Sequence, residues 1–141
     1  MLGYRVIVCD AREVFATTQR FPLADEVIVE WPNKLIEKFS QNLGSRDAVC
    51  ILTHDAKFDV PAIVSALTTE VGYIGVMGSR KTHEDRTNRL FEVGVTAEEI
   101  ESLFAPLSSL KLLETFDILD DRFRNKGLTR LLEHVFLIVK N

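Results

Sequence analysis

The chain has 141 residues, of which 46% are hydrophobic and 27% charged. This length and apolar content are enough for one compact domain with a buried core. The formal net charge of −4 excludes the basic field that drives nonspecific binding to nucleic acids, so we expect no nucleic-acid partner.

Two features of the sequence bear on its compartment. No apolar run approaches the roughly 20 residues that a membrane-spanning helix needs, and residues 1–5 lack the apolar core of a signal peptide. We therefore expect a cytoplasmic protein without a membrane partner. Cys9 and Cys50 each lie in an apolar run, which favours reduced, buried thiols over a disulfide or a metal site. A regulatory or ligand-binding thiol is the alternative.

Four short apolar runs predict β-strands, and two segments between them predict helices. The strands are Tyr4–Cys9, Val27–Val29, Asp47–Leu52 and Val71–Val76. Apolar residues recur at helical spacing over 35–43 and 60–67. Because strands that alternate with helices indicate parallel crossover connections, the pattern predicts an α/β fold. Its parallel sheet has about four strands and is flanked by helices.

After the fourth strand the pattern becomes helical. A helix is predicted over 79–93, with Gly94 as its stop signal. A capping box over 96–99 then starts a short helix that ends near Pro106.

The remaining residues predict a tail of two amphipathic helices divided at 125–127. Their apolar stripes are Leu112, Phe116, Leu119 and Phe123, followed by Leu128, Leu131, Leu132, Val135 and Val139. We therefore expect a domain over 1–106 and a helical tail over 107–141 that packs on it.

Ligands of open parallel sheets bind at the carboxyl ends of the strands, and here those ends are polar. Asp10 follows the first strand. It either accepts hydrogen bonds from ribose hydroxyls or caps the turn through nearby backbone N–H groups. Arg12 pairs either with Asp10 or with a ligand phosphate. The third strand leads into Thr53, His54 and Asp55, which we expect at the same crevice.

The stretch from Gly75 to Arg86 predicts an anion-binding turn. Gly78 provides the turn, and Ser79 begins a helix whose unpaired backbone N–H groups carry the positive end of the helix dipole. Arg80, Lys81 and Arg86 add positive charge. The combination favours a phosphate-bearing ligand. The alternative is a capped helix with a solvated face that exposed ion pairs support.

His54, Asp55 and Asp59 have the residue types of a metal or general-base site. The metal interpretation is disfavoured because no second histidine lies at ligand spacing, and Asp59 stands at a predicted helix start, where a capping carboxylate is expected. We expect no protein-bound metal and no catalytic residue. The candidate ligand-binding residues are Asp10, Arg12, Thr53, His54, Asp55, Gly75, Gly78, Ser79, Arg80 and Arg86.

Four ordered blocks of sequence carry a resemblance to a known family. They are Gly3–Val6 with Asp10–Arg12, Arg20–Pro22 with Ala24–Val27, Leu52–Asp59, and Tyr73–Gly75 with Gly78–His83 and Arg86. In this order they resemble the C-terminal Rossmann domain of the xanthine dehydrogenase accessory factor (XdhC/CoxI) family, over Gly3–Pro106.

The resemblance implies a non-catalytic maturation factor. Such a factor binds the molybdenum–pterin cofactor, helps it acquire its terminal sulfur and hands it to a molybdenum hydroxylase such as xanthine dehydrogenase. The implied ligand is a molybdopterin-type cofactor, and the implied partners are the molybdenum hydroxylase apoenzyme and a sulfur donor protein. A pterin that carries a phosphate suits the anion-binding turn.

The chain departs from the family pattern at both ends. Proteins of the family precede the Gly3–Val6 strand with another strand, a glycine-rich turn and a helix, and their last helix differs from the tail over 107–141. The missing first strand would lie at the centre of the sheet, and exposed strand edges recruit other chains. We expect the slot to be closed by dimerisation or strand exchange, by a strand-completing partner, or by direct pairing of the flanking strands beneath the tail helices.

Two other functional classes stay open. A nucleotide-dependent oxidoreductase or transferase would use Asp10 for ribose and His54 as a general base, but the sequence lacks the glycine-rich pyrophosphate turn of such enzymes. A truncated interaction module, with a vestigial pocket and a partner bound by the tail, is the other alternative.

Overall fold

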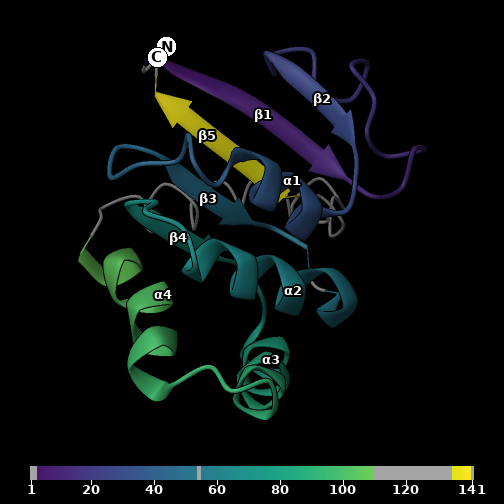
Figure 1. Ribbon diagram of the computed structural model, residues 1–141. Coiled ribbons are helices and arrows are strands. Elements are labelled where there is room, and N and C mark those ends of the chain that lie inside the picture. Colours follow the sequence, from purple (N-terminus) through teal and green to yellow (C-terminus); the bar gives the residue numbers. More distant parts are fainter. Residues whose placement is uncertain (1–2, 54, 110–134, 141) are drawn as a thin grey trace.

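The computed structural model describes residues 3–53, 55–109 and 135–140, and for residues 80, 104–109 and 135–140 it describes the backbone alone. Figure 1 shows one sheet with helices packed around it. The elements in chain order are β1 (Tyr4–Asp10), β2 (Glu26–Val29), α1 (Pro32–Phe39), β3 (Ala48–Ile51), α2 (Ala56–Leu67), β4 (Tyr73–Val76), α3 (Arg80–Glu92), α4 (Ala97–Ser109) and β5 (Val135–Lys140).

The α/β, Rossmann-like fold predicted from the alternating pattern is confirmed. β1 pairs in parallel with β2, and β3 pairs in parallel with β4. Each of these strands is a short run rich in Val and Ile, because β-branched side chains suit a pleated, buried surface. The four strands lie within the segments predicted for them or within one residue of their ends.

The centre of the sheet corrects the predicted tail. The strand order is β2-β1-β5-β3-β4, so the C-terminal strand lies between β1 and β3. It runs antiparallel to both, and Val135 is opposite Cys9 on one side and Ile51 on the other. The helix predicted up to Val139 is therefore wrong over 135–140, and the sheet is mixed rather than parallel. The remaining tail positions, 110–134, lie outside the described residues.

The physical reason for the correction lies in the neighbours of β5. An apolar run such as Val135–Val139 fits a helical stripe or a buried strand equally well by sequence alone. β1 and β3 present unpaired backbone edges on either side, and pairing with both satisfies the N–H and C=O groups of all three strands. The slot expected between β1 and β3 is thus closed by a strand of the chain itself, which differs from each of the three expected routes.

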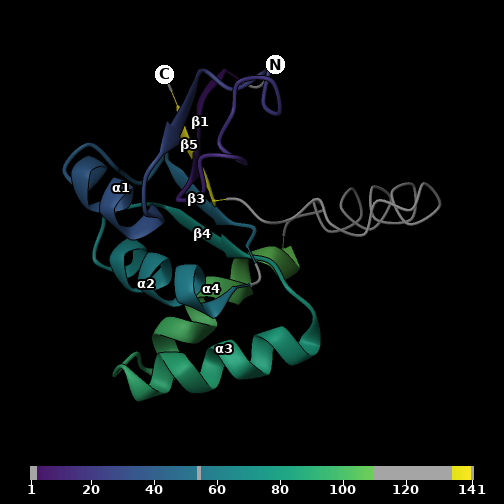
Figure 2. The ribbon, with the colours of Figure 1, turned by 90° about the vertical axis from the view of Figure 1, so that its right-hand side faces the viewer.

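The helices pack on the sheet and on one another. α1 and α2 pack on each other and against β1 and β3, α4 packs against β4, and α3 packs against α2 (Figures 1 and 2). The core between sheet and helices is apolar and fully buried, with Ile7, Val49, Ile51, Leu35, Ile36, Ala62, Ile63, Leu90 and Leu103 among its members. No helix in the described part of the chain is long and apolar enough to cross a bilayer.

Local sequence signals mark the end of α3 and the start of α4. Gly94 adopts a φ of +91° directly after α3, as predicted for a stop signal. The capping box before α4 is also confirmed, because Thr96 Oγ1 accepts from Glu99 N at 3.2 Å and Thr96 N donates to Glu99 Oε2 at 2.8 Å. α4 continues to Ser109, beyond the end predicted at Pro106.

Candidate functional site

An ion pair between Asp10 and Arg12 lies at the carboxyl end of β1. Asp10 is 4% exposed. Its Oδ1 accepts from Arg12 N at 2.8 Å and Arg12 Nε at 3.0 Å, and its Oδ2 accepts from Arg12 Nη2 at 3.0 Å. The Arg12 guanidinium lies 4.4 Å from the ring centroid of Phe15 and 5.5 Å from that of Phe58. Asp10 therefore caps the turn and also holds Arg12.

The segment after β3 places two further predicted residues at the same edge of the sheet. Thr53 is buried, and its Oγ1 accepts from Asp55 N at 3.1 Å. Asp55 is the N-cap of α2 and accepts from Lys57 N at 3.0 Å. The capping role expected of Asp59 therefore belongs to Asp55, because the helix begins earlier than its apolar spacing predicted. His54 lies outside the described residues.

Asp59 and Arg86 form a buried ion pair that joins α2 to α3. Each is 1% exposed. Arg86 donates to Asp59 Oδ2 from Nε at 3.1 Å and from Nη2 at 2.5 Å, and Nη2 also donates to the Met77 carbonyl at 2.9 Å. Arg86 Nη1 is buried and has no hydrogen-bond partner among the described residues. A buried donor without an acceptor costs about 1–3 kcal/mol, so an acceptor from outside those residues would stabilise this nitrogen.

The start of α3 has the cap predicted for it. Ser79 is the N-cap, and its Oγ accepts from Thr82 N at 3.2 Å and lies 2.8 Å from Thr82 Oγ1. Gly78 lies against Arg86, because a Cβ at this position would be 3.3 Å from Arg86 Nη2. The backbone of Arg80 begins α3, and its side chain is not described.

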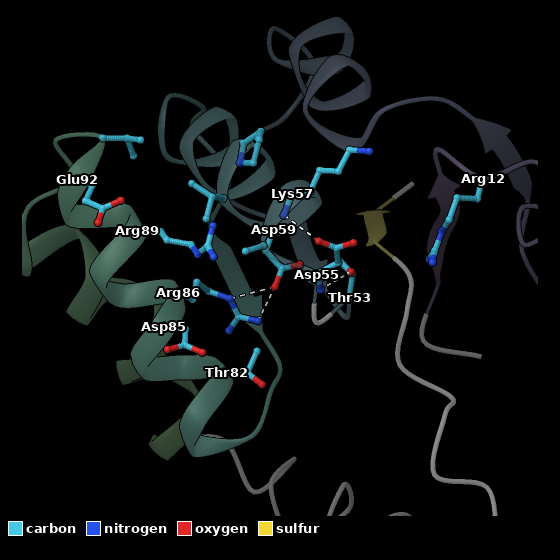
Figure 3. A pocket seen from close by; sticks show the side chains of 14 residues that line it. Arg12, Thr53, Asp55, Lys57, Asp59, Thr82, Asp85, Arg86, Arg89 and Glu92 are labelled. Carbon is cyan, nitrogen blue, oxygen red and sulfur yellow. Dashed lines mark hydrogen bonds and ion pairs between the residues drawn. The ribbon is translucent and has the colours of Figure 1, made fainter.

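A cleft of about 830 Å³ opens between α2 and α3. Figure 3 shows side chains of both helices facing it, with Arg12 at its far end. Of the predicted ligand-binding residues, Arg12, Thr53, Asp55 and Arg86 line this cleft. Asp10 adjoins it, because it shares a small hollow of about 10 Å³ with Arg12 and Thr53.

The remaining predicted residues are not brought into the lining. Gly78 and Ser79 are exposed at the turn before α3 and lie outside the cleft wall. Gly75 is buried inside β4, where a Cβ would come within 2.7 Å of the Tyr73 ring. A glycine stands here because a side chain would collide with the Tyr73 ring, not because a ligand contacts this position.

Several lining residues were missed by sequence reasoning. They are Ala56, Lys57, Asp59, Val60 and Pro61 on α2, and Thr82, Asp85, Arg89, Glu92 and Val93 on or next to α3. The signal on α3 was present, because 82, 85, 86 and 89 have the spacing of a single helix face. The cleft has balanced charge, since its lining holds four basic side chains (Arg12, Lys57, Arg86, Arg89) and four acidic ones (Asp55, Asp59, Asp85, Glu92).

Two aromatic rings outside the cleft lining lie against the lining residues Arg12 and Lys57. The ring centroids of Trp31 and Phe58 are 5.1 Å apart. Lys57 Nζ lies 5.2 Å from the Trp31 centroid and 5.6 Å from the Phe58 centroid. Trp31 is 41% exposed, so its ring offers a flat surface beside one cation of the cleft lining, Lys57.

Both cysteines are free; Cys9 is buried as predicted, whereas Cys50 is only half-buried. Burial raises the pKa of the Cys9 thiol to about 12 and that of Cys50 to about 11. Cys9 Sγ donates to the Glu30 carbonyl at 3.1 Å. Both thiols are therefore protonated at neutral pH, which disfavours a role as a nucleophile. Within the described ranges, no group of three or more His, Cys, Asp or Glu side chains is arranged to hold a metal ion.

The fold and the cleft define an α/β domain of Rossmann type with a polar, small-molecule-sized cavity at the carboxyl edge of its parallel strands. Comparison with known sequences gives its family. The chain belongs to the XdhC Rossmann domain family, whose model matches residues 1–108, as the ordered blocks of sequence predicted.

Two curated relatives match part of the chain. It is 33% identical over 88 residues to a protein of Bacillus subtilis (strain 168) described as a probable xanthine dehydrogenase subunit, covering 62% of this chain and 25% of the relative. It is 32% identical over 68 residues to the molybdenum cofactor insertion chaperone PaoD of Escherichia coli (strain K12), covering 48% of this chain and 21% of the relative. The matches thus span about a quarter of the length of these relatives.

Proposed function

We propose that this chain is a non-catalytic maturation factor that binds a molybdenum–pterin cofactor for insertion into a molybdenum hydroxylase such as xanthine dehydrogenase. Membership of the XdhC Rossmann domain family supports the proposal. So do the names of the two relatives, one a molybdenum cofactor insertion chaperone and the other a probable xanthine dehydrogenase subunit. The partners are the molybdenum hydroxylase apoenzyme and a separate sulfur donor protein, and the compartment is the cytoplasm.

The observation that carries the proposal is the cleft between α2 and α3. Its volume of about 830 Å³ lies in the range of small-molecule and cofactor sites. A pterin cofactor combines a flat, polar ring with a phosphate. The cleft has Arg12 and Lys57 at one end, where they lie against the neighbouring Phe58 and Trp31 rings, and the guanidinium groups of Arg86 and Arg89 farther along α3. The described residues therefore fit the group.

The cofactor and the residues of this chain have different roles. When bound, the cofactor supplies the molybdenum centre that the recipient enzyme uses for redox chemistry. This chain's own part is to bind and orient the cofactor. Lys57 and Arg12 are cations beside a flat surface, and Thr53 lines the floor. Because Cys9 and Cys50 are held as neutral thiols by burial, the terminal sulfur comes from the donor protein rather than from the described cysteines.

A nucleotide-dependent enzyme fits the site less well. The candidate ribose ligand, Asp10, already uses both carboxylate oxygens on Arg12. A thermal-shift screen separates the two functions, because a specific ligand raises the melting temperature. A larger shift with NAD or ATP than with a pterin would contradict the proposed function.

The direct test is to identify what the protein binds in cells. The full chain is purified from cells that make molybdenum cofactor, and the retained pterin is measured by mass spectrometry and by fluorescence after oxidation. We expect pterin in the wild-type protein and several-fold less in Lys57→Gln, which removes a cation from the cleft wall. Lys34→Gln changes an exposed cation on α1 outside the cleft and serves as the matched control. Absence of pterin, or equal loss in both variants, would contradict the proposal.

A further inference from the structure

The Asp59–Arg86 ion pair leaves one donor group of Arg86 unused. Asp59 Oδ2 accepts from Nε and Nη2, and the Met77 carbonyl accepts from Nη2 as well. Nη1 is buried and has no hydrogen-bond partner among the described residues. Because Arg86 lines the cleft (Figure 3), an acceptor oxygen at the cleft floor would satisfy this nitrogen. Asp59 acts as a positioning residue, since it fixes the plane of the guanidinium.

The neighbours of Arg86 on α3 extend this donor into a site. Thr82 lies one turn before Arg86 and Arg89 one turn after it, and all three line the cleft. Positions i, i+4 and i+7 share one helix face, so a hydroxyl and two guanidinium groups stand in a row. Thr82 belongs to the first turn of α3, where unpaired backbone N–H groups and the helix dipole favour negative charge.

The chemistry of this row matches an oxyanion. Guanidinium groups bind phosphate oxygens through charged, directional hydrogen bonds, and the hydroxyl adds a neutral donor. Asp59 offsets the charge of Arg86, while Arg89 is exposed and has Asp85 and Glu92 on the same face. The net charge of the site is therefore modest. The arrangement of its hydrogen-bond donors, rather than its total charge, would select a phosphate group.

We infer that Thr82, Arg86 and Arg89 form an oxyanion site on the α3 wall of the cleft, and that this site takes the phosphate group of the bound ligand. The inference rests on the proposed function only for the identity of that ligand. The site itself predicts binding of a simple phosphate compound. It also predicts the ligand's orientation, with the phosphate at α3 and the ring toward Arg12 and Lys57 at the other end of the cleft.

The experiment uses the full chain and inorganic pyrophosphate, with inorganic phosphate as a second probe, at constant ionic strength set with chloride. Isothermal titration calorimetry measures the dissociation constant. We expect saturable binding of one pyrophosphate per chain. Arg89→Gln and Thr82→Val should each weaken it, by about tenfold for the loss of one charge-assisted hydrogen bond. Lys34→Gln removes an exposed cation on α1 outside the cleft, and should change the constant by less than about twofold.

Arg86→Lys tests the central donor. Lysine keeps a cation for Asp59 but lacks the second terminal nitrogen, so saturable binding should be lost. Circular dichroism and a melting curve check that this variant folds, and if it does not, Arg89→Gln and Thr82→Val decide the question. Absence of saturable binding to wild type, or equal weakening by Lys34→Gln and Arg89→Gln, would overturn the inference.

A competition arm separates this inference from the proposed function. Neopterin, which has a pterin ring and no phosphate, should leave pyrophosphate binding unchanged. If neopterin displaces pyrophosphate, the oxyanion site is wrong and the acceptor is a ring oxygen. If pterin is retained from cells and pyrophosphate does not bind, the oxyanion site fails while the cofactor function stands. If pyrophosphate binds but no pterin is retained from cells, the oxyanion site stands and the cofactor function fails.

Discussion

Arg86 and Asp59 are 27 positions apart in the chain, yet both the Nε and the Nη2 of Arg86 donate to one carboxylate oxygen of Asp59. The pair links the two helices that form the walls of the cleft. Among the described side chains of α3, Leu90 is the other fully buried one, so this ion pair and an apolar contact both hold the helix. The pair therefore helps to hold the two walls of the cleft together.

Breaking the pair should destabilise the protein strongly. Asp59→Ala leaves a buried guanidinium without its carboxylate, and we expect a loss of about 3–5 kcal/mol in the free energy of unfolding, measured by urea denaturation. Glu26→Gln, which breaks the exposed pair with Arg5, is the control and should cost less than about 1 kcal/mol. The double variant Asp59→Leu with Arg86→Met should recover most of the loss, because it removes both buried charges. No recovery would show that packing, not charge, dominates.

The central strand should be sensitive to proline at its middle. Leu137 is opposite Ile7 in β1 and Val49 in β3. Leu137→Pro removes a backbone N–H from the middle of β5 and disrupts a ladder between two strands. We expect a large drop in melting temperature, together with dimers or larger species in size-exclusion chromatography with light scattering, because the edges of β1 and β3 become available.

Lys140→Pro provides the matched comparison for β5. Lys140 is at the end of the strand and is opposite Tyr4, so fewer pairings depend on it. The melting temperature should fall less than in Leu137→Pro. Equal effects at the two positions would contradict the placement of β5 in the centre of the sheet.

Gly72 should tolerate no side chain. A Cβ at Gly72 would lie 2.0 Å from the backbone carbonyl oxygen of Ser45, and the Gly72 N–H donates to the Asp47 carbonyl at 3.1 Å. Gly72→Ala therefore forces the loop before β3 away from β4, and we expect about 1–3 kcal/mol of destabilisation by thermal or urea unfolding. At Gly44 the nearest atom to a Cβ is 3.9 Å away, so Gly44→Ala should be close to neutral.

His83 should make stability fall in mild acid. Burial lowers the pKa of His83 below 6.5, and the positive charge of Arg86 adds to this effect. The folded state thus binds the proton less well than the unfolded state. The contribution of neutral His83 to the free energy of unfolding is complete above pH 6.5. It is lost as the pH falls from there through the folded-state pKa. His83→Gln should reduce the slope of unfolding free energy between pH 7 and 5, measured by urea titration at each pH. An unchanged slope would contradict this origin.

The sequence predicted the four parallel-paired strands and the helices between them, because each has a local signal. β-branched runs predict β1 to β4, and Gly94 and the Thr96 capping box delimit α3 and α4 through contacts only a few residues long. The sequence likewise predicted that Arg12, Thr53 and Asp55 face a common crevice, since strands that run in one direction end at one edge.

The tertiary structure decided the features that depend on partners far along the chain. β5 is a strand only because β1 and β3 offer their edges to it, and a run such as Val135–Val139 carries no sign of those neighbours. The partner of Asp59 is Arg86 on another helix, so local spacing predicted a helix cap instead. Periodicity and capping act within a turn or two of the chain, whereas strand order and buried charge pairs depend on which elements share the core.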